Sequence, residues 1–357
     1  MSPLQAVSDM LFDFAYPNVW DALKNTKKPV ILYGMGNGAD KVLDECERRG
    51  ITAAGVMASD GFVRSQSFRG FTVKRQSELE KELGGFLIAL CFGSDLPDVT
   101  AHIRQVAREH ELVVPNVPVI GNEILDGKYL SEHRQEIESA CALLADEASQ
   151  KVFKGALDFF YTGRLHYLDK IDSDKDEVFR DILRLKNESY LDLGAYRGDT
   201  VEEFLRYADG YTRIVAVEPN PKNFLKLSEH LSAIDRAEAI HAGIADREGV
   251  TAVTKGGGRM AALNGENGVE VPVTTVDALG CQPTYIKVDI EGMESAMLKG
   301  AVHTLKKLKP KLNLAAYHRT GDFFGLILQL HAINPDYKIR LRKHPCIPCW
   351  DLNIYAV

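Results

Sequence analysis

Long apolar runs and cysteine are both scarce in this chain of 357 residues. Its longest uninterrupted apolar stretch covers residues 86–92, whereas a membrane helix needs about 20 apolar residues. We therefore predict no membrane span. The first residues, MSPLQAVSDMLFDF, lack a basic segment followed by a long apolar one, so we also predict no signal peptide.

The cysteines are spread over the whole sequence, a distribution too sparse for a disulfide framework. The six are Cys46, Cys91, Cys141, Cys281, Cys346 and Cys349. The last two form a C-x-x-C pair, but two thiols do not complete a zinc site and the sequence has no second pair. We therefore predict that the thiols are reduced and that none of them is a metal ligand. Reduced thiols also predict a cytoplasmic location.

The chain also has no excess of positive charge. It contains 43 Lys and Arg against 50 Asp and Glu, so its net charge is −7. Binding nucleic acid normally needs a basic face, and we therefore predict no nucleic-acid partner. With 45% hydrophobic and 26% charged residues, the composition excludes a disordered or fibrous protein. The length predicts two or three domains.

Residues 1–125 alternate short apolar runs with helical patterns. A strand at residues 29–33 leads into the glycine turn GMGNGA (residues 34–39), and further strands are predicted at 51–56, 86–92 and 112–114. This alternation is typical of a parallel sheet. We predict a Rossmann-like α/β domain of unknown ligand. Residues 126–186 show helical periodicity without strand signals and are predicted to be a helical connector.

The glycine turn at residues 34–39 fits G-x-G-x-x-G/A, and Asp60 lies near the end of the second strand. The match is weak, because a strand, a glycine turn and a helix also close such a domain without a ligand. If the turn does bind a ligand, the helix N-terminus suits a diphosphate. The alternatives are then an NAD(P)-dependent oxidoreductase or a nucleotide-sugar-binding protein.

Residues 187–357 are predicted to form a second, doubly wound α/β domain that ends in an antiparallel hairpin. Its strands are expected at residues 190–193, 213–217, 239–242, 269–273, 284–288, 311–316, 338–341 and 352–356. A helix is expected at residues 295–308, ended by Pro310. A polar, glycine-rich segment at 256–259 is expected to be a surface loop or a lid.

The strongest motif is DLGAYRGDT (residues 192–200), which follows the first strand of this domain and opens a helix. Its glycines allow a sharp turn and a close approach to a ligand. The spacing D-x-G-x-x-x-G differs from the dinucleotide pattern G-x-G-x-x-G. Glu218 follows twenty residues after Gly198 and ends the next strand, where a carboxylate accepts hydrogen bonds from ribose hydroxyls.

These residues resemble motifs I and II of the class I S-adenosylmethionine-dependent methyltransferases. The downstream block TYIKVDIEGME (residues 284–294), followed by LKGA (298–301), resembles the K-x-D-x-E-G-x-E…L-x-G-A signature of the FkbM methyltransferase family. TVDAL (275–279) and the chain's last two strands also fit that family. The resemblance covers about residues 188–357, so the N-terminal Rossmann-like domain is an addition to it.

The resemblance implies methyl transfer from S-adenosyl-L-methionine to a hydroxyl oxygen of a sugar or other small natural-product-like acceptor. It implies that Gly194 and Gly198 line the methionine end of the cofactor, that Glu218 holds the ribose and that Asp199 meets the amino group. Asp246 is equally well explained as a turn residue. The implied cofactor-binding residues are Asp192, Gly194, Ala195, Tyr196, Gly198, Asp199, Thr200, Glu218, Pro219, Asn220, Gly243, Asp246 and Asp289.

The predicted catalytic residues are Asp289, Glu291 and His318, which follow two neighbouring strands and converge on one edge of the sheet. Three interpretations remain open. His318 acts as the general base and Asp289 orients it; the three residues bind a divalent metal; or Glu291 only caps a helix. We favour the first and predict no metal. Tyr317 is placed beside them to face a sugar. The oligomeric state, including a homo-oligomer, is left open.

Overall fold

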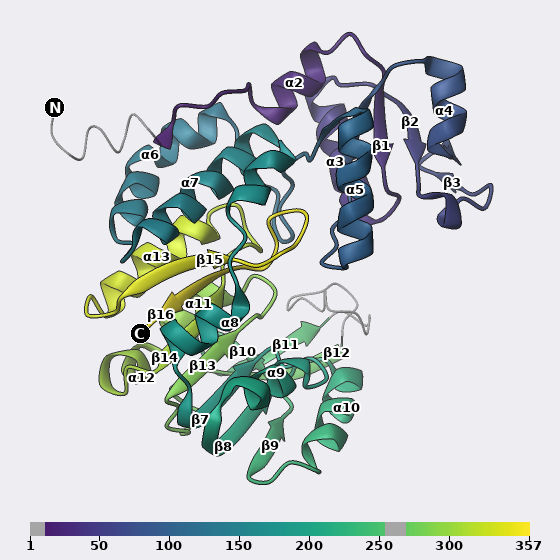
Figure 1. The fold of residues 1–357 in the computed structure, drawn as a ribbon. Coiled ribbons are helices and arrows are strands. Elements are labelled where there is room, and N and C mark those ends of the chain that lie inside the picture. Colours follow the sequence, from purple (N-terminus) through teal and green to yellow (C-terminus); the bar gives the residue numbers. More distant parts are fainter. Residues whose placement is uncertain (1–10, 254–268) are drawn as a thin grey trace, which may run out of the picture.

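The computed structural model describes residues 11–253 and 269–357. Most of the predicted N-terminal helix and the predicted lid at residues 256–259 lie outside these ranges. Strands in the described part form sheets of six, seven and three strands (Figure 1). The mixed α/β architecture with two parallel sheets confirms the predicted fold class. No helix in the described ranges is long and apolar enough to cross a membrane.

The N-terminal sheet has the strand order β3-β4-β2-β1-β5-β6, and its strands are parallel except for β3. The central strand β1 is buried along its whole length because helices cover both faces. The strands are β1 (Val30–Tyr33), β2 (Ala53–Met57), β3 (Ser67–Phe68), β4 (Phe71–Lys74), β5 (Leu87–Leu90) and β6 (Glu111–Val113). The helices are α2 (Val19–Asn25), α3 (Asn37–Arg49), α4 (Gln76–Leu83) and α5 (Pro97–Glu109), with the short 3-10 turn η1 (Asp60–Phe62).

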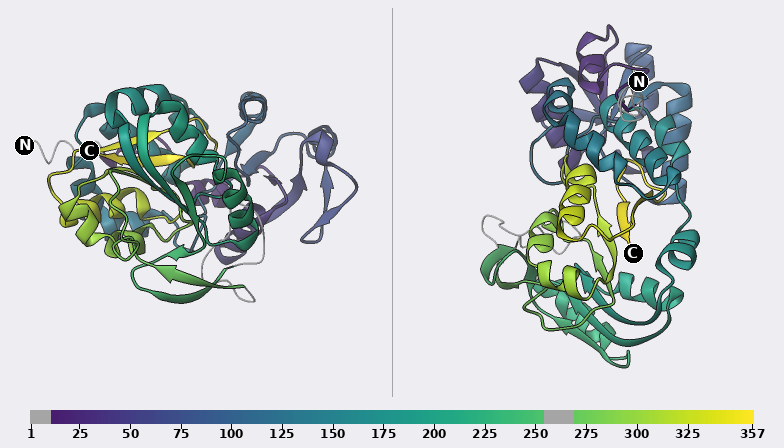
Figure 2. Two further views of the ribbon diagram at one scale, coloured as in Figure 1. Left: turned by 90° about the horizontal axis from the view of Figure 1, so that it is seen from below. Right: turned by 90° about the vertical axis from the view of Figure 1, so that its left-hand side faces the viewer.

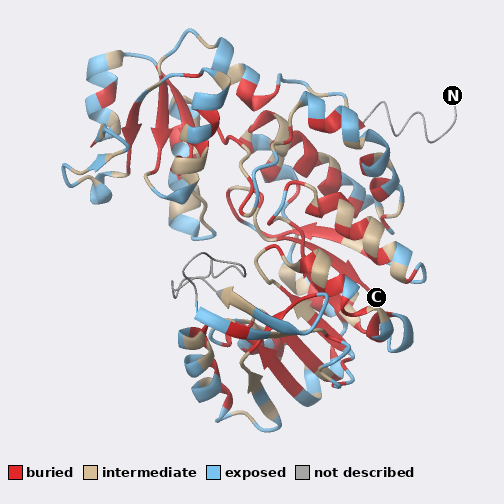
Figure 3. Ribbon diagram, turned by 180° about the vertical axis from the view of Figure 1, so that it is seen from behind, coloured by how far each residue is buried: buried red, intermediate tan, exposed pale blue. Residues whose placement is uncertain are grey.

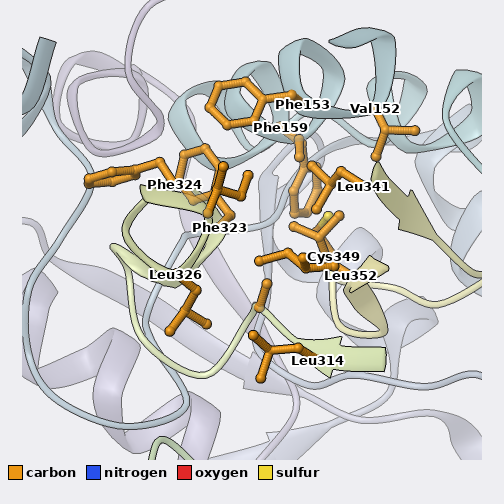
Figure 4. Close-up of a cluster of buried hydrophobic side chains, with 14 of the residues drawn as sticks. Val152, Phe153, Phe159, Leu314, Phe323, Phe324, Leu326, Leu341, Cys349 and Leu352 are labelled. Carbon is orange, nitrogen blue, oxygen red and sulfur yellow. The ribbon is translucent and has the colours of Figure 1, made fainter. Parts of the chain in front are cut away.

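The segment between the two large sheets is helical, as its periodicity predicts. It contains α6 (Gly127–Ala142), α7 (Glu147–Thr162), η2 (Leu165–Lys170), α8 (Lys175–Glu177) and η3 (Val178–Leu183). Helix α7 packs its apolar face, including Phe153 and Phe159, against Phe323 and Leu341 of the last part of the chain (Figure 4). The helical segment therefore shares one hydrophobic core with the C-terminal sheet and is not a separate linker.

The C-terminal sheet has the order β9-β8-β7-β13-β14-β16-β15. The strand order reverses between β7 and β13, and in an open parallel sheet ligands bind at the carboxyl ends beside such a switch point. Only the final hairpin is antiparallel. The strands of this sheet are β7 (Lys186–Leu193), β8 (Asp209–Val217), β9 (Ala237–Ile240), β13 (Tyr285–Val288), β14 (Lys311–Ala315), β15 (Ile339–Lys343) and β16 (Leu352–Ala356). Its helices are α9 (Asp199–Tyr207), α10 (Pro221–Leu231), α11 (Glu294–Lys299), α12 (Val302–Lys307) and α13 (Asp322–Ile333).

Two details differ from the sequence-based expectation. The strand expected at 269–273 is not part of the large sheet. As β12 (Val269–Thr274) it pairs with β10 (Gly243–Ile244) and β11 (Gly249–Val253). The single helix expected at 295–308 is broken in two, because the carboxylate of Asp277 accepts the main-chain N–H groups of His303 and Thr304 and starts α12.

The strands and inward helix faces are buried, whereas the outer helix faces are exposed (Figure 3). The right-hand view of Figure 2 shows the N-terminal unit at one end of the molecule and the first strands of the C-terminal sheet at the other, with the helical segment and the hairpin of β15 and β16 between them. All six cysteines are free and buried, in agreement with the predicted reduced thiols.

Candidate functional site

The turn after β7 is shaped by glycine. Gly194 has φ +81°, and a Cβ there would lie 1.9 Å from the carbonyl oxygen of Asp289, so only glycine lets the ends of β7 and β13 come this close. Gly198 has φ +99° and precedes helix α9. Below the turn, Asp192 is fully buried and accepts a hydrogen bond from the Thr200 hydroxyl. Burial raises the pKa of Asp192 to about 6.

Glu218 ends β8 next to this turn and is fixed by the main chain. Its Oε2 accepts the N–H of Tyr196 at 3.0 Å and its Oε1 accepts the N–H of Asn220 at 2.8 Å. Burial raises the pKa of Glu218 to about 7, although these hydrogen bonds favour the charged form. A carboxylate with two oxygens retains further acceptor capacity on the cleft side, which suits a pair of vicinal hydroxyls.

A cleft of about 660 Å³ runs along the carboxyl edge of the sheet from Glu218 to His318. The predicted residues that line it are Gly194, Tyr196, Asp199, Thr200, Glu218, Pro219, Gly243, Asp289, Glu291 and His318. The other predicted residues do not line the cleft. Asp192 and Ala195 are buried, Gly198 precedes helix α9, Asn220 caps α10, and Asp246 is exposed in the turn after β10. Tyr317, which the sequence placed beside the catalytic residues, also lines the cleft. The structure adds further lining residues, which include Ser94, Asp95, Lys175, Lys287, Asn313, His344 and Trp350.

His318 sits among carboxylates at the end of β14. Its Nε2 lies 3.3 Å from Oδ1 of Asp289 and 3.5 Å from Oε2 of Glu291, and its Nδ1 lies 3.0 Å from Oε1 of Glu294. The structure therefore brings together the three residues that the sequence predicted as catalytic. It adds Glu294, which is 1% exposed. The second Glu of the E-G-x-E motif was the available sequence signal for it.

These contacts set the charge of the cluster. Burial lowers the pKa of His318, but the nearby carboxylates of Glu294, Asp289 and Glu291 outweigh burial and raise this pKa to about 10. His318 is therefore an imidazolium at neutral pH and forms ion pairs with the surrounding carboxylates. Burial raises the pKa of Glu291 to about 7, with His318 opposing the shift. Of the two, Glu291 is the group whose proton exchanges near neutral pH.

Two further interpretations of this cluster can be compared with the geometry. Among the described residues, Glu291 makes no capping hydrogen bond to α11, whose N-cap is Met293 without a side-chain cap, and Oε1 of Glu294 accepts the N–H of Ile290 at 3.1 Å. Glu291 lies in the preceding turn with φ +52° and faces the cleft. A group of three potential cation ligands in the described ranges consists of Asp289, Glu294 and His318, with their ligand atoms within 4.8 Å of one another. The sequence-based metal interpretation used Glu291 in place of Glu294.

The glycine turn predicted in the N-terminal unit, at residues 34–39, does not line the cleft at the carboxyl edge of the C-terminal sheet. Gly36 and Gly38 line a second cavity of about 220 Å³, which is mostly apolar. Asp60, the carboxylate expected for a dinucleotide site, is exposed and does not line this cavity. Gly38 is needed for packing, since a Cβ there would lie 2.2 Å from the carbonyl oxygen of Cys91.

Comparison with known protein families matches residues 192–339 to the methyltransferase FkbM domain. The chain is similar to the solved structure of methyltransferase FkbM from Methylobacillus flagellatus KT, with a TM-score of 0.72 and 21% identity over 99% of this chain and 98% of that one. At that identity the likeness shows the fold. No curated protein matches the chain.

Two other solved structures overlap about half of the chain. Precorrin-6y C5,15-methyltransferase from Geobacter metallireducens GS-15 has a TM-score of 0.33 and 14% identity, over 53% of this chain and 94% of that one. Aeropyrum pernix fibrillarin, solved with S-adenosyl-L-methionine, has a TM-score of 0.32 and 14% identity, over 48% and 67%. Similarity this low carries no argument about this chain.

Proposed function

Because the chain carries a methyltransferase FkbM domain over residues 192–339, we propose that it transfers the methyl group of S-adenosylmethionine to a hydroxyl oxygen of a sugar or another small hydroxylated acceptor. The observation that carries this proposal is the shared cleft: Glu218 and the Gly194 turn line one part of it, and Asp289, Glu291 and His318 line another. A cofactor site and a proton-accepting site thus adjoin at one sheet edge.

The residues around Glu218 fit the cofactor. A carboxylate at the end of β8, held by the N–H groups of Tyr196 and Asn220, is oriented to accept ribose hydroxyls. The absence of a side chain at Gly194 lets the main chain of Asp289 approach the turn closely, which brings the two strand ends together beside the cleft. When bound, S-adenosylmethionine supplies an electrophilic methyl group on a sulfonium centre. The protein has to align the acceptor oxygen with that methyl group.

The protein must also take up the hydroxyl proton, because an alcohol is a weak nucleophile near neutral pH. We assign this step to Glu291, which lines the cleft and has a pKa raised to about 7. The positively charged His318, 3.5 Å from Glu291, is assigned the role of holding the carboxylate in place. Asp289 and Glu294 balance the charge of His318 from its two ring nitrogens. The base role thus moves from His318, which the sequence favoured, to Glu291, and the positioning role moves from Asp289 to His318.

We propose a division of labour that follows the predicted domains. Residues 187–357 carry the cofactor and the chemistry, and residues 126–186 buttress this unit through α7. Residues 1–125 contribute one wall of the cleft through Ser94 and Asp95.

Calorimetry with S-adenosylmethionine, S-adenosylhomocysteine and NAD tests the function. We expect both sulfur ligands to bind and NAD to produce no heat. Binding of NAD alone would refute the proposal and favour an oxidoreductase. Glu291→Gln is expected to retain cofactor binding and lose methyl transfer. A fully active Glu291→Gln variant would contradict the assigned base, and the matched His318→Gln variant would then test the imidazole as the base.

A further inference from the structure

The second cavity is enclosed by all three predicted segments of the chain. Its volume is about 220 Å³, and apolar atoms form most of its surface. Aromatic side chains from distant positions form its walls: Phe92 from the N-terminal unit, Phe159 and Phe160 from α7, and Tyr317, Phe323 and Trp350 from the C-terminal unit. The main chain at Gly36 and Gly38 completes one side.

This cavity adjoins the catalytic cleft. Gly93, Val119, Tyr317 and Trp350 line both spaces. The hydroxyl of Tyr317 lies 3.4 Å from each carboxylate oxygen of Asp289. One side chain thus forms part of the apolar wall and also reaches the catalytic cluster. A molecule that places a hydroxyl near Glu291 therefore has the apolar cavity next to it.

The wall between the two spaces is held by contacts between the N- and C-terminal parts. Main-chain hydrogen bonds join Ser94 and Ile347 in both directions, at 2.6 and 3.0 Å. Trp350 packs over Gly93 so closely that a Cβ on that glycine would lie 2.3 Å from the indole ring. The cavity consequently exists only because the N-terminal unit docks on the loop between β15 and β16.

Both cationic side chains at the cavity, Lys41 and Arg319, donate to main-chain carbonyl oxygens, which makes them less available to a ligand. The ammonium of Lys41 donates to the carbonyl oxygens of Pro118 and Val119, both at 2.7 Å. Arg319 donates through Nε to the carbonyl of Gly292 at 2.8 Å. The cavity thus offers mainly ring faces and edges, which favour a flat apolar group through burial and stacking.

We propose that this cavity binds the non-reacting end of the methyl acceptor, and that this end is an aromatic or similarly flat apolar group. The inference rests on the proposed methyl transfer and narrows its acceptor class to aryl-bearing hydroxyl compounds. It also gives the N-terminal unit a function. That unit supplies an acceptor-binding wall, and its glycine turn brings the main chain close to the acceptor.

The probe is 2-naphthol, a flat aromatic molecule whose absorption overlaps tryptophan emission. The chain has only two tryptophans, and Trp20 is 1% exposed with its indole N–H unpaired in the described part of the chain. A full-length Trp20→Phe protein therefore leaves Trp350 as the single emitter. We expect 2-naphthol to quench Trp350, also in the presence of saturating S-adenosylhomocysteine.

Two glycine variants locate the binding. A Cβ at Gly36, which lines the cavity, or at Gly85, which does not, meets no atom within 4 Å. Both glycines are exposed and have φ outside the left-handed region. Gly36→Leu is expected to weaken 2-naphthol binding roughly tenfold or more, whereas Gly85→Leu leaves it within about twofold. Phe160→Ala provides a second cavity variant with an expected loss in the same direction.

Three results would overturn the inference: no quenching of Trp350, equal affinity in Gly36→Leu and the Gly85→Leu control, or displacement of 2-naphthol by S-adenosylhomocysteine. Calorimetry with wild-type protein makes the same comparison if Trp20→Phe does not fold. Loss of S-adenosylhomocysteine binding in the wild type would instead refute the proposed function. The two failures are therefore distinguishable.

Discussion

Glu218→Gln tests how the cleft holds the ribose. Each carboxylate oxygen of Glu218 already accepts one main-chain N–H, from Tyr196 or Asn220, and the remaining acceptor capacity faces the cleft. The amide keeps the shape but has one accepting oxygen and no charge. A hydrogen bond to a charged group contributes about 1.5–3 kcal/mol. The dissociation constant for S-adenosylhomocysteine is therefore expected to rise roughly 10- to 150-fold.

The assay is isothermal titration calorimetry near pH 8, at which Glu218 is ionised, because burial raises its pKa only to about 7. The protonation equilibrium fixes the sign of the pH effect. As the pH falls through about 7, the wild-type carboxyl takes up a proton and loses its charge, so the difference between wild type and Glu218→Gln should shrink. Glu229→Gln, an exposed change on the nearby helix α10, is the matched control and should bind like wild type.

Thermal unfolding separates binding from folding in this experiment. In Glu218→Gln, the side-chain NH₂ group faces a main-chain N–H donor in place of the carboxylate oxygen that accepted it. The melting temperature of the variant should therefore fall, although the protein still folds. An unchanged dissociation constant in a folded Glu218→Gln protein would refute the assignment of Glu218 to the ribose. An equal loss of affinity in Glu229→Gln would show that the effect is not local to the carboxylate.

Three other perturbations address the turn, the base and the metal question. The Gly194→Ala protein should lose cofactor binding and melt at a lower temperature. The new Cβ would lie 1.9 Å from the Asp289 carbonyl oxygen, and φ at this position is left-handed. A Gly194→Ala protein with the cofactor affinity and melting temperature of the wild type would contradict this. In a pH–rate profile, the turnover of the wild type should rise through about pH 7 as Glu291 loses its proton. The residual rate of Glu291→Gln should not rise over this range. If it does rise, the pH dependence does not come from Glu291. Protein treated with EDTA should keep its activity, since His318 supplies the positive charge among the carboxylates. If EDTA abolishes activity and added Mg²⁺ restores it, the cluster binds a metal.

The elements that the sequence predicted well are those governed by local rules. Buried strand runs and the glycine turn at residues 192–200 were predicted from composition and spacing, and the antiparallel terminal hairpin from the family resemblance. The predicted helix at 295–308 was wrong in one respect, its break, because the capping carboxylate of Asp277 lies more than twenty residues away in the sequence. The strand at 269–273 was identified, but its position in a separate three-stranded sheet depends on partners that periodicity does not specify.

The candidate site shows the same division. The positions of Asp289, Glu291 and His318 at strand ends came from the sequence pattern, and the strand order implied by the family resemblance made the two strands neighbours, so their carboxyl ends meet at one edge. The charge of His318 could not be predicted, since it depends on the distances to three carboxylates and on burial. That tertiary arrangement favours Glu291 as the base.

The sequence by itself determined the fold class and predicted a cofactor motif and the sheet edge at which we place the chemistry, because strands, helices and glycine turns follow from steric and periodic constraints between near neighbours. Only the tertiary structure showed where the N-terminal unit docks. Ser94 and Ile347 are remote in the chain, yet their pairing brings the first sheet onto the last loop and closes the apolar cavity. Such contacts depend on the packing of complete surfaces, which no local pattern encodes.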